Sequence, residues 1–428
     1  MNALKGSRGA RIFAGIALVS ASALVIAGCS STPSGEKTND GNKKPAADLT
    51  LKLGSLLPSS GSLAFLGPPM YAAVGLATQE INDAKAGVTV SMNSQDEGDS
   101  DTKAYVTSIT TLQNAGVAGI VGAAASGVSK IILDGNVSKG IITISPSNTS
   151  PDFTKLAEDG ATKGLYFRTA PSDLLQGEVL GNLMSQDGRK SLGIIFQNDP
   201  YGTGLRDAIK KTFEESGGKV VATAGFNVGD SQFDAQVETI KAANPDAVAV
   251  VSFEQFRTIA PLLVNAGITA DHFYMVDGNV SNYGTTGDSA IPVSLEGAQG
   301  TRPGPALKDD FTNRLQKYWT GKGNAEIKDF TYAAESYDAV VLMALASLEA
   351  KSVKGVDIAK KMQAVSGGVE GGTACTTFAE CAKIINDGGK ADYNGYSGDI
   401  TFDKWGDPQG AAIGVFKYGA DNMYTRTN

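Results

Sequence analysis

The sequence predicts an α/β protein with two lobes, each built on a doubly wound, mostly parallel sheet. Short apolar runs alternate with helical patterns from Leu49 onward, and the same alternation begins again at Ser191. The chain has 428 residues, of which 42% are hydrophobic and 19% charged, and it contains 52 glycines. This composition is typical of a globular protein with many tight turns, and the length allows two or three domains.

The composition excludes several classes of function. Lys and Arg total 37 against 45 Asp and Glu, which gives a formal net charge of −8 and disfavours a nucleic-acid binder. The single histidine, His272, and three cysteines are too few for a His-based zinc site, a multi-cysteine cluster or a Ser-His-Asp triad. We therefore expect no metal, no cofactor and no enzymatic activity.

The first 28 residues predict a secretory signal. Basic residues precede an uncharged apolar stretch from Ile12 to Ile26, and small residues follow that stretch. The apolar stretch is shorter than the roughly 18 to 20 residues that span a bilayer. Removal of the three basic residues Lys5, Arg8 and Arg11 would change the formal net charge from −8 to −11.

The signal ends at Ala27-Gly28-Cys29, which resembles a bacterial lipobox. That resemblance implies cleavage before Cys29, lipid such as palmitate on the mature protein, and anchoring at the outer face of the cytoplasmic membrane. Residues 29–47 are polar and suit a flexible tether. The alternative is an ordinary cleaved signal in which Cys29 has no role.

Export would also place the remaining cysteines in an oxidising compartment. Cys375 and Cys381 lie six residues apart with no histidine nearby. We therefore expect a disulfide that braces a local loop, in preference to a metal site.

The expected elements follow from apolar runs and from apolar residues at helical spacing. Strands are predicted at Leu49–Leu57, Val88–Met92, Ala118–Gly122, Ile141–Ser145, Ser191–Phe196, Lys219–Gly225, Ala247–Val251, His272–Val276, Ser397–Asp403 and Ala411–Tyr418. Helices are predicted at Met70–Asp83, Thr102–Asn114, Gly204–Ser216, Phe233–Ala243, Phe256–Ala266, Pro305–Trp319 and Phe330–Ala350. Strand and helix alternation with short connections indicates parallel sheets covered on both faces.

Three local patterns do not support the nucleotide, calcium or catalytic site that each suggests. Gly122 to Gly127 has the glycine spacing of a P-loop, but Val128 stands where the phosphate-binding lysine is needed. The acidic residues from Asp96 to Asp101 match no EF-hand spacing, so we expect a solvated loop there and not a calcium site. His272 begins a predicted strand, where a structural or exposed histidine is more common than a catalytic one.

A binding site is predicted at the carboxyl ends of the strands, where open α/β sheets hold their ligands. Loops at Ser126 and Ser147 precede or join helices and would offer free N–H groups to a carboxylate. The second lobe offers Tyr201, Phe253 and Asp277, and a facing acid suits an ammonium group. This pattern predicts an amino-acid binder, although a serine after a strand is often only a helix cap and Phe253 suits a core equally well.

From about Leu49 to Tyr418 the chain resembles the leucine/isoleucine/valine-type substrate-binding proteins of bacterial ABC importers, which have the type I periplasmic-binding-protein fold. The matching segments, specific in their order and spacing, are Gly54–Gly61, Ile120–Gly127, Ile144–Pro151, Phe167–Asp173, Gln176–Gly177, Asp199–Leu205, Asn244–Asp246, Val276–Gly278, Tyr337–Ala339 and Gly395–Gly398.

The resemblance implies roles for individual residues. Ser126 and Thr149 would hold the ligand carboxylate, the Ser147 carbonyl and the Thr149 hydroxyl would receive the ammonium, and Asp277 would neutralise it. Tyr201 and Phe253 would close over the ligand from the second lobe. Leu66 falls at the mouth of the pocket, where an aromatic residue is common in the family.

The resemblance also implies the domain organisation. Lobe 1 would comprise residues 48–169 and 303–396, and lobe 2 residues 170–302 and 397–428. Three crossings, near Ala170–Ser172, Gly300–Pro303 and Tyr396–Asp399, would form a hinge for closure around the ligand.

The function implied is that of a monomeric, extracytoplasmic lipoprotein that passes an amino acid, branched-chain or related, to an ABC permease. A binder of urea or short amides is one alternative. A ligand-sensing lobe for a signalling partner is another, and an enzyme on the same fold is a third.

Overall fold

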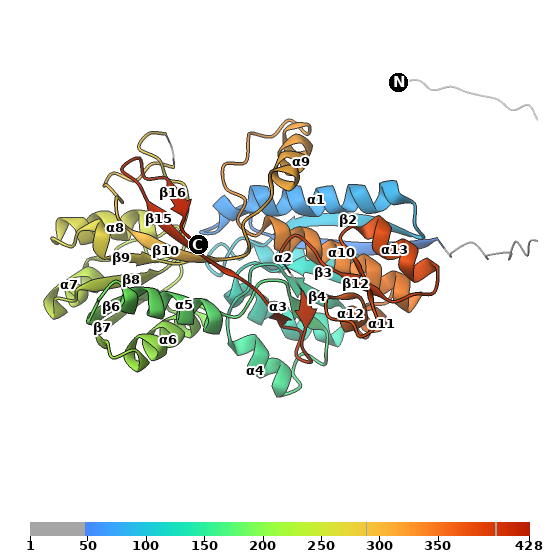
Figure 1. The fold of residues 1–428 in the computed structure, drawn as a ribbon, viewed down its shortest axis with the longest axis horizontal. Coiled ribbons are helices and arrows are strands. Elements are labelled where there is room, and N and C mark those ends of the chain that lie inside the picture. The colour runs from blue at the N-terminus through green and yellow to red at the C-terminus, as the bar shows by residue number, and fades with distance from the viewer. Residues whose placement is uncertain (1–47, 288, 399) are drawn as a thin grey trace, which may run out of the picture. The chain divides into compact units, whose positions relative to one another are not determined.

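A computed structural model describes residues 48–287, 289–398 and 400–428 of the chain. The predicted signal peptide, the tether and Cys29 lie outside the described residues. The described part has the expected α/β architecture, with two sheets side by side and helices on both faces of each (Figure 1). We call the part built on the first sheet lobe 1, and the part built on the second sheet lobe 2.

Lobe 1 contains an all-parallel sheet of strand order β2-β1-β3-β4-β5. Its strands are β1 (Leu49–Leu57), β2 (Val88–Asp96), β3 (Gly119–Gly122), β4 (Ile142–Ser145) and β5 (Tyr166–Arg168). Every residue of the three strands β3, β4 and β5 is buried, as expected for parallel strands covered on both faces. Because β3, β4 and β5 are parallel, their carboxyl ends share one edge of the sheet. The site is built at that edge.

Helices of lobe 1 come from both halves of the chain. They are η1 (Ala64–Leu66), α1 (Gly67–Ala84), α2 (Ala104–Asn114), α3 (Ser126–Ser138), α4 (Asp152–Glu158), α9 (Asp309–Thr320), α10 (Ala333–Ala350), α11 (Gly355–Ala359), α12 (Met362–Val365) and α13 (Phe378–Asn386). Helices α1 and α10 cover one face of the sheet, and α2 and α3 pack near the other. All residues of α10 from Ala333 to Leu348 are buried, so this helix is the centre of the lobe.

Lobe 2 contains a mixed sheet of order β16-β15-β10-β9-β8-β6-β7. Its strands are β6 (Ser191–Gln197), β7 (Lys219–Phe226), β8 (Ala247–Val251), β9 (Phe273–Met275), β10 (Gln299–Pro303), β15 (Ile413–Tyr418) and β16 (Tyr424–Arg426). Strands β6 to β10 are parallel, whereas β15 and β16 are antiparallel to their neighbours. Its helices are α5 (Asp173–Gln186), α6 (Pro200–Glu215), α7 (Asp234–Ala243), α8 (Phe256–Asn265) and η2 (Ala270–His272).

Two small sheets complete lobe 1. Strand β11 (Thr373–Cys375) pairs with β12 (Ala391–Tyr393), and β13 (Thr401–Phe402) pairs with β14 (Pro408–Gln409). The predicted disulfide is present, because Cys375 at the end of β11 is joined to Cys381 in α13. The bond links a strand to the following helix and braces the loop between them.

The crossings between lobes differ from the prediction at two places. The first lies between Arg168, at the end of β5, and Asp173, at the start of α5. The predicted second crossing is strand β10 itself, and the chain leaves lobe 2 only after Pro303. The predicted third crossing is placed too early, because Asp338 of α10 accepts from Ser397 N at 2.7 Å and Asp407 is still in lobe 1. The chain enters lobe 2 at β15, so the predicted lobe boundaries at 303 and 397 shift accordingly.

Some predicted elements are also shorter in the structure. The predicted strand Ser397–Asp403 contracts to the two residues of β13, and α9 begins at Asp309, four residues after the predicted start at Pro305. His272 belongs to η2, and its Nδ1 lies 2.8 Å from the Asp246 carbonyl.

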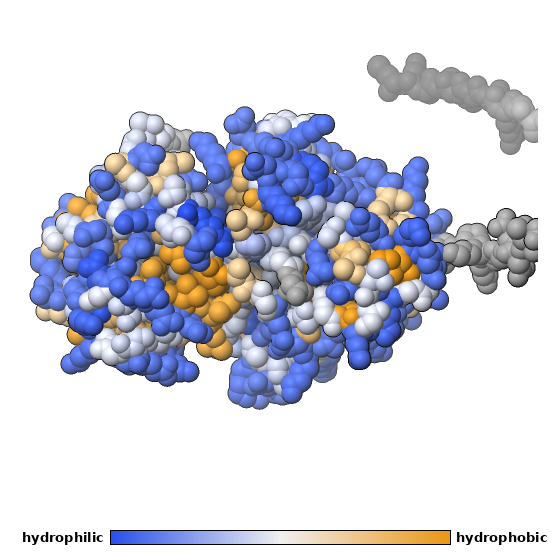
Figure 2. All heavy atoms as spheres, viewed as in Figure 1, coloured by the Kyte–Doolittle hydropathy of each residue, from blue (hydrophilic) through white to orange (hydrophobic). Residues whose placement is uncertain are grey.

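The surface visible in Figure 2 is mostly hydrophilic, with hydrophobic residues gathered on lobe 2 next to its boundary with lobe 1. Among the described helices, none has the length and apolar character needed to cross a membrane.

Candidate functional site

Lobe 2 contributes a carboxylate and two aromatic rings to the cleft between the lobes. Asp277 follows β9, is only 3% exposed, and accepts a hydrogen bond from the Tyr201 hydroxyl at 2.8 Å. Tyr201 stacks on Phe253 with ring centroids 5.0 Å apart. Asp199 caps α6 by accepting from Gly202 N at 2.8 Å, and this cap fixes the turn that presents Tyr201.

Asp277 is held between the lobes by two phenols. The hydroxyl of Tyr332, at the N-cap of α10 in lobe 1, donates to Oδ2 of Asp277 at 2.5 Å. Burial raises the pKa of Asp277, while the hydrogen bonds from Tyr332 and Tyr201 oppose that rise because they favour the ionised form. A second buried acid, Asp173, lies near enough that the charge of Asp277 adds to the burial that raises its own pKa.

Lobe 1 contributes the N-terminus of α3. Ser126 is the first helical residue, and the N-cap Ala125 has no side chain that can accept from the first turn. The first N–H groups of a helix have no partner within it, and the helix dipole is positive there. A carboxylate in front of Ser126 would therefore receive backbone N–H groups and the serine hydroxyl.

Glu97 holds the residues just before this helix in place. The sequence did not predict this role. The carboxyl group of Glu97 accepts from Ala124 N and, at 2.8 Å, from Ala125 N. Glu97 is fully buried and Asp99 is 7% exposed, so the expectation of a solvated loop from Asp96 to Asp101 is wrong. Burial raises the pKa of Glu97 to about 8, although the two N–H groups act in the opposite direction.

The other acids of that loop are also structural. Asp96 accepts from Ser59 N at 2.8 Å, and Asp99 accepts from Ser62 N at 2.9 Å, so both tie β2 to the loop after β1. Among the residues that the structure describes, no group of three or more His, Cys, Asp or Glu side chains could hold a metal ion.

The loop after β4 lies beside Ser126 but presents only part of the predicted set. Ser147 reaches the cavity, and its hydroxyl donates to the Ala124 carbonyl at 3.3 Å. Thr149 does not line the cavity. Its hydroxyl donates instead to Oδ2 of Asp173 at 2.9 Å, across the start of α5, and its carbonyl accepts from Asp173 N at 2.7 Å.

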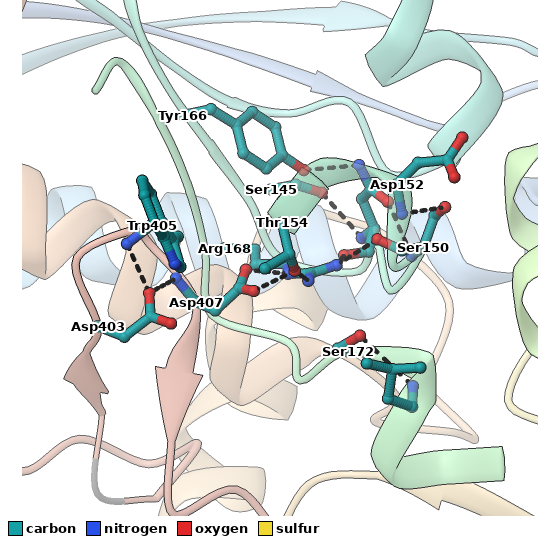
Figure 3. A network of polar contacts seen from close by, with 12 residues as sticks. Ser145, Ser150, Asp152, Thr154, Tyr166, Arg168, Ser172, Asp403, Trp405 and Asp407 are labelled. Carbon is teal, nitrogen blue, oxygen red and sulfur yellow. Dashed lines mark hydrogen bonds and ion pairs between the residues drawn. The ribbon is translucent and has the colours of Figure 1, made fainter. Parts of the chain in front are cut away.

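A buried arginine holds this loop in place. Arg168 at the end of β5 is wholly buried, and it donates to the carbonyls of Asn148 at 3.3 Å and Ser150 at 2.7 Å. Its Nε pairs with Asp407 at 2.6 Å, and Figure 3 shows the guanidinium between Asp407 on one side and the Ser150 loop on the other. Arg168 thus connects the segment next to the third crossing with the loop that carries Ser147.

These groups surround one narrow space between the lobes, with room for about one water molecule. It is lined by Leu63, Leu66, Ala124, Ala125, Ser126, Ser147, Tyr201, Phe253, Asp277, Gly278 and Tyr332. It offers an anion site at the N-terminus of α3, a cation site at Asp277, and apolar walls from both lobes.

The cavity brings together six of the seven predicted ligand residues and leaves out Thr149. Tyr332 was missed because no local pattern distinguishes a tyrosine before an apolar helix from a core residue. Glu97 was missed because an acidic run after a strand is ordinarily solvated.

This chain is similar to known proteins in sequence and in fold. Residues 50–389 match the family described as periplasmic binding protein. The chain belongs to that family.

Relatives of this periplasmic binding protein extend over nearly its whole length. It is 29% identical over 392 residues to a Leu/Ile/Val-binding protein homolog 1 of Brucella abortus (strain 2308), which covers 88% of this chain and 93% of that protein. A leucine-, isoleucine-, valine-, threonine- and alanine-binding protein of Pseudomonas aeruginosa is 30% identical over 200 residues, 46% of this chain and 52% of that protein.

Solved structures share the fold of this periplasmic binding protein. A leucine binding protein from Thermotoga maritima has a TM-score of 0.69 at 20% identity and covers 88% of this chain and 98% of that one. A branched-chain amino acid transporter substrate binding protein from Streptococcus pneumoniae, in complex with isoleucine, has a TM-score of 0.66 at 20% identity, with 88% and 100% covered. A solute binding protein from R. palustris, in complex with benzoate, has a TM-score of 0.66 at 18% identity, with 89% and 96% covered.

Proposed function

We propose that this periplasmic binding protein captures an α-amino acid, branched-chain or related, between its lobes and delivers it to an ABC importer permease. The observation that supports the proposal most is the placement of Ser126 at an open helix N-terminus and of Asp277 on the facing lobe, within one small cavity. Those two groups match the carboxylate and the ammonium of an amino acid. The names of the relatives from Brucella abortus and Pseudomonas aeruginosa agree with this ligand class.

In this proposal Ser126 receives the carboxylate and Asp277 the ammonium. Asp277 and Asp173 are both buried, and their pKa values are raised by burial, which is the condition that an incoming cation relieves. Ser147 would accept from the ammonium through its carbonyl. Thr149 would contribute only if its bond to Asp173 gives way on binding.

The buried acid also weighs against two other ligand classes. Some structural neighbours hold benzoate or 4-hydroxybenzoate, but an aromatic carboxylate has no cation for Asp277. Urea or a short amide would leave Asp277 with a neutral partner only, and a buried charge without a counter-charge is unfavourable. A sensor role would require a further signalling partner that binds the same closed form.

We also propose that the mature protein is a monomer anchored by lipid on Cys29. The sequence Ala27-Gly28-Cys29 and the polar residues up to 47 support it. An anchored binding protein remains close to the membrane-embedded permease, so the ligand travels a short distance.

Calorimetry with leucine tests the ligand assignment. Asp277→Asn should weaken binding by roughly 3 to 5 kcal/mol, which takes a dissociation constant on the order of 1 μM towards the millimolar range. Ser126→Ala should cost about 1 to 3 kcal/mol because the backbone donors remain. Asp271→Asn, which removes an acid exposed at the far end of β9, is the matched control and should leave binding unchanged. Asp277→Asn within about threefold of wild type would favour a neutral ligand.

A further inference from the structure

A buried acid stands behind the ligand cavity without lining it. Asp173 is the first residue of α5, directly after the first crossing between the lobes, and it is 0% exposed. Its backbone N–H donates to the Thr149 carbonyl of lobe 1 at 2.7 Å. Asp173 is therefore buried at the hinge and not at the mouth of the cleft.

One oxygen of this carboxyl group has no partner. The Thr149 hydroxyl donates to Oδ2 at 2.9 Å, but no group in the described part of the chain donates to Oδ1. Gln176, one turn further along α5, also has a buried Oε1 without a partner, while its amide nitrogen donates to the Thr301 carbonyl at 3.1 Å. Buried acceptors without donors are unfavourable. A proton on Oδ1 of Asp173 would remove one such acceptor and supply a donor one turn from the other.

The charges around Asp173 also favour a proton. The ionisable groups that face it from neighbouring elements are Arg168, Asp199, Tyr201, Asp277 and Tyr332. The two tyrosines stay neutral, because burial raises their pKa values still further. Arg168 is the one cation in this set, and its Nε already pairs with Asp407 at 2.6 Å. Burial and then the charge of Asp277 raise the pKa of Asp173 well above its usual range.

Among the three acids of this set, Asp173 has the hydrogen bonds that suit the protonated form. Asp277 accepts from a phenol on each of its oxygens. Asp199 accepts from Gly202 N on one oxygen and from Gln197 Nε2 on the other, each at 2.8 Å. Donors on both oxygens favour the ionised form of an acid, whereas Asp173 has a donor on one oxygen only.

We infer that Asp173 holds a proton in the ligand-free protein and releases it when the ammonium group of the ligand reaches Asp277. The inference rests on the proposed function, because it needs a cationic ligand at Asp277. The ammonium brings one positive charge to the three acids. The O–H bond of Asp173 then breaks, its electron pair stays on Oδ1, and the proton passes to the solvent. Binding thus exchanges one cation for another, so the affinity for the amino acid should rise with pH.

Calorimetry of leucine binding in two buffers of different ionisation enthalpy counts the released protons. The observed enthalpy varies with the ionisation enthalpy of the buffer in proportion to that number, and at about pH 6.5 we expect the wild type to release about one proton per leucine. Glu97, the other buried acid near the cavity, adds little to the count. Burial raises its pKa to about 8, so it already holds its proton at this pH.

Asp173→Asn has an amide donor at this position and no proton to release. Its leucine affinity should not change between about pH 5.5 and pH 7.5, whereas that of the wild type should rise by up to about tenfold per pH unit. Glu178→Gln is the matched control, because Glu178 is an exposed acid on the same helix. This control should release as many protons as the wild type.

Infrared difference spectroscopy supplies a measurement that needs no variant. Addition of leucine to the wild type should remove the band of a protonated carboxyl group. This measurement stands even if Asp173→Asn does not fold, a defect that loss of its thermal transition would reveal.

The outcomes separate the two proposals. Wild type that binds leucine without releasing a proton overturns the inference and leaves the proposed function intact. Equal proton release by Asp173→Asn and wild type, or an unchanged band of the protonated carboxyl group, overturns it as well. Failure of the wild type to bind leucine, isoleucine or valine overturns the proposed function and the inference with it.

Discussion

The hydroxyl of Tyr332 reaches from lobe 1 to Oδ2 of Asp277 in lobe 2 at 2.5 Å. Tyr332 has φ of 60°, a left-handed backbone conformation that is uncommon for a bulky residue and is maintained only where surrounding structure imposes it. Tyr201 donates to the other oxygen of the same carboxylate at 2.8 Å, from within lobe 2. One carboxylate therefore has one phenol from each lobe.

A comparison of Tyr332→Phe with Tyr201→Phe should distinguish an effect on closure of the lobes from an effect on ligand contact. Each variant removes one hydroxyl donor from Asp277, but only Tyr332 spans the cleft. We expect Tyr332→Phe to increase the radius of gyration of the ligand-free protein by small-angle scattering, and Tyr201→Phe to leave it unchanged. Both should weaken leucine binding by about 1 to 3 kcal/mol. Equal radii for the two variants would show that the Tyr332 hydrogen bond does not hold the lobes together.

Arg168 and Asp407 should show strong coupling in a double-mutant cycle. Asp407→Asn leaves a wholly buried guanidinium without its counter-charge, and we expect a loss of about 3 to 5 kcal/mol of unfolding free energy. Arg168→Met together with Asp407→Asn should cost clearly less than the sum of the single changes. Urea unfolding measures all three, and strict additivity would contradict the pairing.

The pH dependence of stability should contain a contribution from Glu335. Burial raises the pKa of this acid of α10 from 4.5 to about 8. Between those values the unfolded chain is ionised while the folded chain keeps the proton, so the unfolding free energy falls by about 1.4 kcal/mol per pH unit. The contribution is complete below about pH 4.5 and is lost as the pH rises through about 8.

Glu335→Gln should reduce the slope, measured by urea unfolding at several values between about pH 5 and pH 8, and the contribution of Glu97, whose pKa burial also raises to about 8, should remain. Glu349→Gln is the matched control on the same helix, since Glu349 is partly exposed and pairs with Lys361 at 3.4 Å. Identical slopes in wild type and Glu335→Gln would mean that the acid is ionised in the folded protein.

Removal of the disulfide should affect stability without affecting binding. Cys375 and Cys381 close a loop of only a few residues, for which the chain-entropy model gives about 2 kcal/mol. The cavity residues come from other elements, so Cys375→Ser with Cys381→Ser should retain leucine affinity within about twofold. A large loss of affinity would reveal a connection between this loop and the cleft.

Cys29→Ala should release the protein from the membrane fraction while ligand binding is retained, because the lipid and not the folded body supplies retention. Fractionation of cells and immunoblotting measure the distribution. Unchanged membrane retention would contradict the lipoprotein assignment.

Local apolar pattern was enough to predict most of the fold. Strand β8 has the predicted bounds, Ala247 to Val251, because five apolar residues stand between Asp246 and the buried Ser252. The position of the third crossing between the lobes could not be predicted from a local apolar pattern. Its position depends on the Arg168–Asp407 ion pair, which joins residues 239 positions apart.

The site was predictable where a strand end supplies the residue. Ser147, Phe253 and Asp277 stand two residues after strand ends and Ser126 four residues after one, and all line the cavity. Tyr332 stands 55 positions from Asp277 and precedes a helix instead, so only the tertiary structure brings it to the cleft.

The burial of α10 has a consequence for biosynthesis. Lobe 1 has all five strands of its sheet once the chain reaches Arg168, yet the helix that covers one face of that sheet begins only at Ala333. At translation rates of about 5–20 residues per second, the intervening stretch takes about 10–30 s to synthesise. During that time α1 lies on this face mainly over β1 and β2, and the part over β3 and β4 lacks the cover that α10 later provides, so the nascent chain exposes apolar strand surface until synthesis is nearly complete.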